Sequence, residues 1–135
     1  MRRLNCSQAF WATAISLTLF SGFVRAELRC GVAKVDVTPN QLPVLVNGSM
    51  TSHTADRVKT RVNARAIVLD DGRERLAIMV VDSCMMPRDL LDEVKQLAST
   101  RTQLRPDRIL ISATHTHTAP SSMGALGTDP DPQYV

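Results

Sequence analysis

The hydrophobic residues of this chain recur in short runs whose spacing predicts strands in its first half. Residues 31–38 alternate in part between apolar and polar side chains, which indicates a strand that the prolyl turn at Pro39 brings to an end. Residues 63–70 and 75–82 form two further runs. The Asp71-Gly72 pair between them is typical of a tight turn, so these two strands are predicted to pair as an antiparallel hairpin.

The second half of the chain predicts a β-α-β unit. The strand over 75–82 is apolar almost throughout, which predicts a central strand covered on both faces. Pro87 follows at a position where helices tolerate proline, and apolar residues recur at helical spacing over 87–99. Residues 108–113 form another buried strand. The order strand, helix, strand predicts parallel pairing with a right-handed connection, and thus an α/β fold on a mixed sheet.

Residues 41–60 show little periodicity and are predicted to form a long loop. They contain Pro43, the pair Asn47-Gly48 and many Ser and Thr residues. Long irregular loops within compact domains are often functional. The loop has one histidine, His53, which we interpret as a surface residue rather than a metal ligand.

Residues 1–26 have the pattern of a secretory signal. Arg2 and Arg3 precede an apolar stretch over 9–24, and Ala26 ends a short-residue cleavage site. A membrane anchor is the alternative, but the stretch is shorter than the ~20 residues that a spanning helix needs. The pattern predicts an exported protein, secreted or periplasmic, whose mature domain begins at residue 27.

The apparent basic charge of the chain comes from this signal. The whole sequence has 16 Lys and Arg against 13 Asp and Glu, a net charge of +3. Arg2, Arg3 and Arg25 lie in the signal, which has no acidic residue, so the mature part is neutral. A neutral chain without a basic patch gives no indication of nucleic-acid binding.

Two of the three cysteines, Cys30 and Cys84, remain after removal of the signal. Export would permit a disulfide between them. Because Cys84 follows a buried strand, a free buried thiol is an equal alternative. The sequence has no Cys-x-x-Cys pair, so no thiolate zinc site is expected.

Polar residues follow both parallel strands at the edge where such sheets carry their sites. Asp82 ends the first strand, and His115 and His117 follow the second. On extended backbone, residues two apart point to one side, so both imidazoles could hold a metal, or one could ligate while the other binds substrate. Imidazole is a usual zinc ligand, although a catalytic zinc needs about three protein ligands. The alternatives are structural histidines, and for Asp82 a cap on the helix that begins at Pro87.

Four segments of the chain resemble the start of the neutral/alkaline, non-lysosomal ceramidases. The most specific is the run Ser112-Ala113-Thr114-His115-Thr116-His117, and the others cover residues 31–39, 61–72 and 80–83. The resemblance spans about residues 29–128. It implies that residues 27–135 are the N-terminal part of a larger zinc hydrolase domain.

The resemblance also implies an activity. Members of this family are zinc amidohydrolases of sphingolipid metabolism that split ceramide, which is N-acylsphingosine, into a fatty acid and sphingosine. It implies that His115 is a zinc ligand and that His117 lies beside the metal and holds substrate, while Asp82 remains a candidate ligand or a neighbour of the ligands. The expected partner is a lipid amide, with contact to a membrane surface. Further ligands follow later in family members, so the 135-residue chain alone is expected to be inactive.

Two departures from the family pattern widen the choice of function. Residues 118–121 read Thr-Ala-Pro-Ser where the family has Ser-Gly-Pro-Gly, and the loop after Asn47-Gly48 lacks the usual aromatic residue. These departures indicate a divergent branch. A secreted metal hydrolase of another amide or ester, and a secreted non-catalytic binding domain, are therefore the alternative functions.

Overall fold

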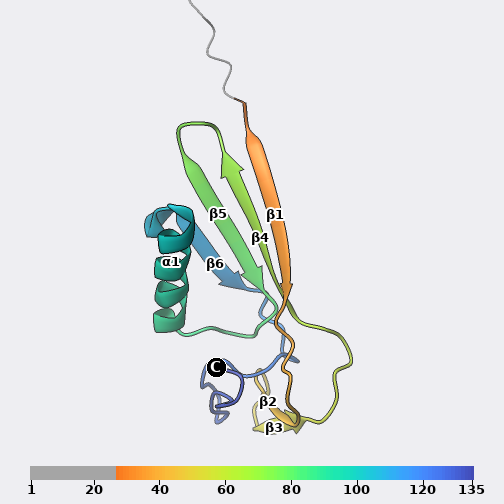
Figure 1. Ribbon diagram of the computed structural model, residues 1–135. Coiled ribbons are helices and arrows are strands. Elements are labelled where there is room, and N and C mark those ends of the chain that lie inside the picture. Colours follow the sequence, from red (N-terminus) through yellow and green to blue (C-terminus); the bar gives the residue numbers. More distant parts are fainter. Residues whose placement is uncertain (1–26) are drawn as a thin grey trace, which may run out of the picture.

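The computed structural model describes residues 27–135, and the predicted signal over 1–26 lies outside the described residues. The described chain forms a four-stranded sheet in the order β1-β4-β5-β6, a separate two-stranded sheet and one long helix (Figure 1). The elements are β1 Arg29–Asp36, β2 Val44–Val46, β3 His53–Ala55, β4 Asn63–Asp70, β5 Arg75–Val81, α1 Arg88–Thr102, a 3-10 turn Pro106–Arg108 and β6 Ile109–Ala113.

The large sheet is mixed, as the sequence predicts. β1, β4 and β5 pair antiparallel, whereas β5 and β6 pair parallel on either side of α1 in the chain. The predicted hairpin joins β4 to β5, with Asp70 opposite Arg75. Gly72 in its turn has a φ of 85°, a conformation that glycine adopts without strain. The mixed sheet and its β-α-β unit are therefore confirmed.

The hydrophobic core lies between α1 and one face of the sheet. Ala77, Ile109 and Ile111 of the sheet are buried there, and Leu91 and Val94 of the helix pack against them. This cluster fixes the helix over the parallel pair of strands (Figure 1).

The opposite face of the sheet is open within residues 27–135. The register places Val32, Ile67, Ile78 and Leu110 in one row across the four strands. At the two ends of this row, Val32 is 80% exposed and Leu110 is 59% exposed. The prediction that β5 is covered on both faces is thus wrong for the described residues, because their single long helix covers one face.

The helix begins one residue later than its predicted start. Pro87 is its N-cap, with extended backbone, and the first helical residue is Arg88. No side-chain hydrogen bond caps this end, so Asp82 does not serve as the cap. The helix continues to Thr102, beyond the predicted end at residue 99, and stops at Gln103, whose φ is 61°.

The segment predicted as a loop over 41–60 contains the small sheet. β2 and β3 pair antiparallel, with Val46 opposite His53. Each strand has three residues, which is shorter than the runs that indicate a strand in a sequence. His53 is exposed on β3, which confirms it as a surface residue.

The carboxyl ends of β5 and β6 point toward the small sheet and the C-terminal segment (Figure 1). The chain that follows both strands therefore lies at the same end of the large sheet. Among the described residues, no helix has the length and apolar character that crossing a membrane requires.

Candidate metal centre

The segment that carries the two histidines continues the pairing of β6 with β5. The backbone N–H of Thr114 donates to the carbonyl of Val81 at 2.9 Å. The N–H of Thr116 donates to the carbonyl of Ser83 at 3.2 Å. These bonds fix the backbone on both sides of His115 beyond the last residue of the strand.

The backbone of His115 is not extended, which corrects the prediction. Its φ is 61°, in the left-handed region that residues with a side chain rarely adopt. The rings of His115 and His117 nevertheless meet, with centroids 4.8 Å apart and planes at 79°. The rings therefore meet across a segment that contains one left-handed residue, and the regular alternation of a strand does not account for their contact.

The ring of His115 is oriented by Cys84. Its Nδ1 lies 2.9 Å from the Cys84 carbonyl oxygen. A carbonyl can only accept a hydrogen bond, so this contact favours the tautomer that carries its proton on Nδ1 and leaves Nε2 free to bind a metal. Metal-bound histidines commonly show this arrangement, in which the second ring nitrogen donates to a carbonyl.

One donor atom from each of Cys84, His115 and His117 lies within 4.8 Å of the other two. Donor atoms around a tetrahedral zinc are about 3.3–3.8 Å apart, as zinc–ligand distances of about 2.0–2.3 Å require. Imidazole nitrogen and thiolate sulfur are both usual zinc ligands, so this donor set fits zinc.

Cys84 is the member of this group that the sequence did not predict. It is 3% exposed and free, and its Sγ lies 3.9 Å from Nδ1 of His115. The absence of a Cys-x-x-Cys pair argued against a thiolate ligand, but a thiol 31 residues away in sequence leaves no spacing signal. Cys30 is also free and is exposed, so no disulfide joins the two cysteines.

Asp82 lies at the end of β5 but does not belong to the three-residue group. Its carboxylate accepts hydrogen bonds from the guanidinium of Arg65 and from the backbone N–H of Asn63, each at 2.9 Å. The hydrogen bond from Arg65 lowers the pKa of the Asp82 carboxyl. In the described structure Asp82 therefore ties β4 to the end of β5.

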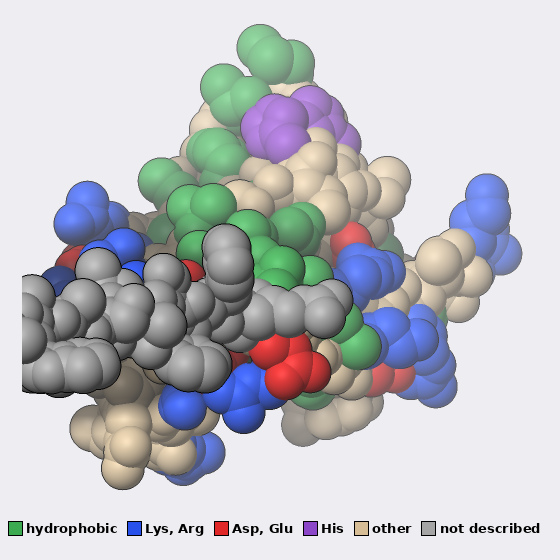
Figure 2. Space-filling view, turned by 90° about the horizontal axis from the view of Figure 1, so that it is seen from above, with side chains coloured by type: hydrophobic (Ala, Val, Ile, Leu, Met, Phe, Trp, Pro, Cys, Tyr) green, Lys and Arg blue, Asp and Glu red, His purple; other side chains and the backbone are tan. Residues whose placement is uncertain are grey.

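Gly48 is a further neighbour of the pair that the sequence did not assign to the site. Its backbone packs directly against His117, and it follows Asn47, which is buried. The pair Asn47-Gly48 in an irregular segment was a turn signal, but that signal does not say against which residue the turn packs. The histidines seen in Figure 2 gather in one cluster at the surface, next to hydrophobic side chains.

Two cavities border the histidine segment. The first has a volume of about 580 Å³ and is lined by Thr116 and Thr118 of the histidine segment. Its other lining residues include apolar and cationic side chains: Val44, Val46, Pro120, Arg57, Lys59 and Arg61. The other, of about 330 Å³, lies beside His115 and has a soft, apolar lining that includes Cys84, Met85, Met86 and Met123. Methionine side chains adapt to apolar ligands of varied shape.

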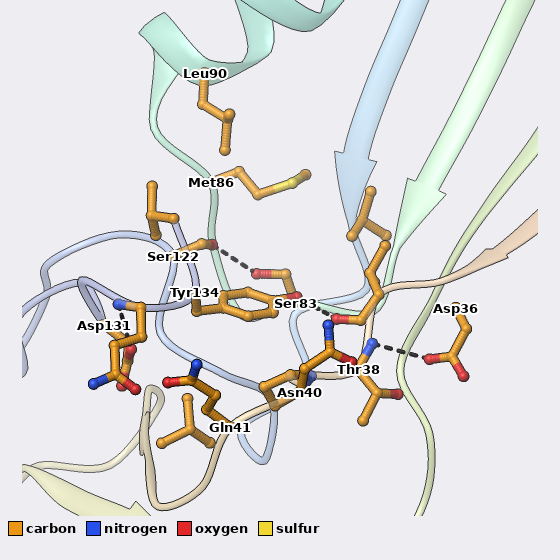
Figure 3. Close-up of a pocket in the computed structure, with 16 residues that line it drawn as sticks. Asp36, Thr38, Asn40, Gln41, Ser83, Met86, Leu90, Ser122, Asp131 and Tyr134 are labelled. Carbon is orange, nitrogen blue, oxygen red and sulfur yellow. Dashed lines mark hydrogen bonds between the residues drawn. The ribbon is translucent and has the colours of Figure 1, made fainter.

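A third cavity, of about 570 Å³, is mainly polar in its labelled part (Figure 3). Tyr134 lies among Ser83, Ser122 and Asn40 there, and its hydroxyl donates to the Val37 carbonyl at 2.9 Å. Burial raises the pKa of the Tyr134 phenol. Neither histidine of the pair lines this cavity, which shares Thr38, Pro39 and Val44 with the first cavity and Met86 with the second.

The chain matches a family model described as the N-terminal part of the neutral/alkaline non-lysosomal ceramidases, over residues 28–126. It is 33% identical over 120 residues to the neutral ceramidase of Drosophila melanogaster, covering 86% of this chain. It is also 33% identical over 118 residues to that of Drosophila pseudoobscura pseudoobscura, covering 84% of this chain. The chain spans 17% of the length of each relative.

Two solved structures resemble the described fold. The crystal structure of neutral ceramidase from Pseudomonas aeruginosa superposes with a TM-score of 0.63 and 23% identity, over 70% of this chain and 16% of that one. A ceramidase complexed with C2 superposes with a TM-score of 0.59 and 25% identity, over 70% of this chain and 15% of that one. The mixed sheet with its helix is thus a fold that occurs within larger ceramidase chains.

Proposed function

Because this chain belongs to the neutral/alkaline non-lysosomal ceramidase family, we propose that it contributes to hydrolysis of the amide bond of ceramide, N-acylsphingosine. The products would be a fatty acid and sphingosine. The observation that carries the proposal is the convergence of Cys84, His115 and His117 at the carboxyl ends of two parallel strands. All three residues lie within the segment that matches the family.

We propose zinc as the metal and Nε2 of His115 as its ligand. The contact between Nδ1 and the Cys84 carbonyl supports this role, because it favours the tautomer whose Nε2 can bind a metal and holds the ring in one orientation. When bound, zinc supplies a Lewis acid that polarises the amide carbonyl and makes water a stronger nucleophile at neutral pH.

We propose that His117 holds the substrate beside the metal. Its ring is exposed and stands edge-on to that of His115. An imidazole in this place can donate a hydrogen bond to an amide carbonyl oxygen or pass a proton to the departing nitrogen. His117 therefore has a different task from the ligand His115, although both belong to one short run.

The cavities beside the histidines suit a lipid amide. The cavity lined by Thr116 and Thr118 combines apolar walls with charged side chains of both signs, Arg57, Lys59, Arg61 and Asp82, which suits a molecule with long chains and a polar head. Arg57, Lys59 and Arg61 would also be attracted to an anionic membrane surface. This fits the proposal that the protein is exported and meets its substrate at a membrane.

A second candidate is a metal hydrolase that acts on another amide or an ester. Two observations favour a substrate other than ceramide. Cys84 places a thiol in the donor group, and residues 118–121 depart from the family run that follows the histidines. Both features surround the reacting centre, where substrate choice is decided.

The test is a comparison of histidine variants in the full-length protein. His115→Ala should lose both zinc and amidase activity. His117→Ala should keep most of its zinc and lose ~10²-fold or more in turnover, as expected when a positioned hydrogen-bond donor or acid is removed. His53→Ala, which removes an exposed histidine outside the group, is the matched control for metal content and should retain its zinc.

Zinc content by atomic absorption, measured beside ceramide hydrolysis, decides the outcome. Stoichiometric zinc in His115→Ala would show that the ligand assignment is wrong and would make Cys84, Asp82 and His53 the next candidates. Zinc binding without hydrolysis of ceramide, but with hydrolysis of another amide or ester, would favour the second candidate. Zinc-free protein that still binds a ligand would favour a non-catalytic domain.

A further inference from the structure

The turn at Asn47-Gly48 is tied to the chain that directly follows the histidine pair. Asn47 is 1% exposed, and its side-chain amide donates to the carbonyl of Met123 and to Oγ of Ser121. Its Oδ1 accepts from the N–H of Gly48 at 2.7 Å, and its own N–H donates to the carbonyl of Ala119 at 3.4 Å. The turn therefore has a fixed position relative to residues 119–123.

The strand before the turn is fixed to the same segment. Val46 forms a bridge with Pro120, and the N–H of Ser121 donates to the carbonyl of Leu45 at 2.8 Å. The N–H of Leu45 donates in turn to the carboxylate of Asp131 at 2.8 Å. The approach to Gly48 is thus anchored by backbone bonds as well as by Asn47.

Gly48 meets His117 with no space between them for a side chain. A Cβ atom on Gly48 would lie 2.5 Å from Cγ, 2.6 Å from Cβ and 2.7 Å from Cα of His117, whereas real Cβ contacts essentially never fall under 3.0 Å. The φ of Gly48 is also +97°, which strains any residue with a side chain. Glycine is therefore required here both by backbone conformation and by the closeness of His117.

We propose that the Asn47-Gly48 turn is a positioning element that sets where the His117 ring stands. The two histidines then have separate supports, the Cys84 carbonyl for His115 and the backbone of Gly48 for His117. The consequence for catalysis rests on the proposed function, in which His117 holds substrate and His115 holds zinc. Displacing the turn should therefore disturb substrate handling and leave the metal in place.

Gly48→Ala tests this inference, with Gly72→Ala as the matched control. Gly72 also has a positive φ, of +85°, but a Cβ there would meet no atom within 4 Å. The control therefore reproduces the strain of alanine in this conformation without the collision. Gly48→Ala should keep its zinc and lose about 10- to 100-fold in kcat/KM, since small misplacements of a catalytic group have effects of this size. Gly72→Ala should keep both.

A double variant tests whether Gly48 acts through His117. If it does, adding Gly48→Ala to His117→Ala should reduce kcat/KM by less than about 3-fold further, because the ring being positioned is already gone. Losses that multiply in the double variant would overturn the inference. If His117→Ala itself has no effect on activity, the proposed function of His117 fails. Whether Gly48 positions the His117 ring is then decided by the nuclear magnetic resonance experiment that follows.

Nuclear magnetic resonance of the metal-free 135-residue chain reports on the contact without any enzyme activity. The unsubstituted chain should show nuclear Overhauser contacts between the Gly48 Hα protons and the side chain of His117. Gly48→Ala should shift the ring signals of His117 more than those of His53, and Gly72→Ala should shift neither. Absence of the Gly48–His117 contact in the unsubstituted chain would overturn the inference even if Gly48→Ala failed to fold.

Discussion

Asp131 joins β2 to the C-terminal segment, and its removal has a calculable local effect. Asp131 is 6% exposed. Oδ2 accepts the N–H of Leu45 at 2.8 Å, and Oδ1 accepts the N–H of Gln133 at 2.9 Å. Asp131→Ala takes away both acceptors. Both hydrogen bonds are partly buried, but Gln133 is an exposed residue and Leu45 is half-buried, so water can replace the acceptor of Gln133 more readily than that of Leu45.

The magnitude follows from the partner that is left without an acceptor. Leaving a buried N–H group without an acceptor destabilises the fold by about 1–3 kcal/mol. If Leu45 exchanges its amide hydrogen through local opening, this range corresponds to exchange about 5- to 150-fold faster, since about 1.4 kcal/mol is tenfold. The increase should be local to Leu45 and its neighbours in β2.

Hydrogen exchange followed by nuclear magnetic resonance measures this directly. Asp129→Ala is the matched control, because Asp129 is an exposed carboxylate in the same segment. It should leave the exchange of Leu45 unchanged, as should amides of β5 in either variant. An Asp131→Ala chain in which Leu45 exchanges at the original rate, or equal acceleration in the Asp129→Ala chain, would refute the reasoning.

Two further predictions concern other parts of the chain. Hydrogen bonds from the Thr38 hydroxyl and backbone N–H, together with the Arg61 guanidinium, lower the pKa of Asp36 from 3.8 to about 2. A depressed pKa stabilises the fold at pH above 3.8, and this contribution is lost as pH falls through about 2; a carboxyl titration of Asp36 with its midpoint near 3.8 would contradict it. Residues 1–26 are expected to be removed on export, so N-terminal sequencing of the secreted protein should begin at Glu27, and an intact Met1 in a membrane fraction would disprove it.

The sequence predicts the parts of the fold that rest on local patterns. β4 has the predicted bounds, because its apolar run is followed by an Asp-Gly turn that fixes the register of the hairpin. The β-α-β unit is equally visible, since both strands and the helix are long enough to show their own periodicity. The residues of the predicted site lie together at one edge of the sheet because parallel strands bring their carboxyl ends together.

The sequence does not show the features that depend on tertiary neighbours. β2 and β3 have three residues each, and Val44 is buried through packing that no local pattern reveals. The backbone of His115 is left-handed and lies between two residues that form hydrogen bonds to the chain around β5. These bonds cannot be predicted from the sequence His-Thr-His, which we interpreted as extended. Cys84 and Gly48 reach the candidate site from distant segments, so only its two histidines form a motif in the sequence.

The distances in sequence between these supports set an order of folding. The hairpin turn separates Asp70 from Arg75, and the bond between His115 and Cys84 spans 31 residues, whereas that between Asn47 and Ser121 spans 74. Contacts between distant residues close larger loops and tend to form late. We expect the sheet to orient His115 early and the Asn47-Gly48 turn to reach His117 last. If His115 binds zinc and His117 holds substrate as proposed, a zinc ion present during folding would meet His115 before His117 is in place.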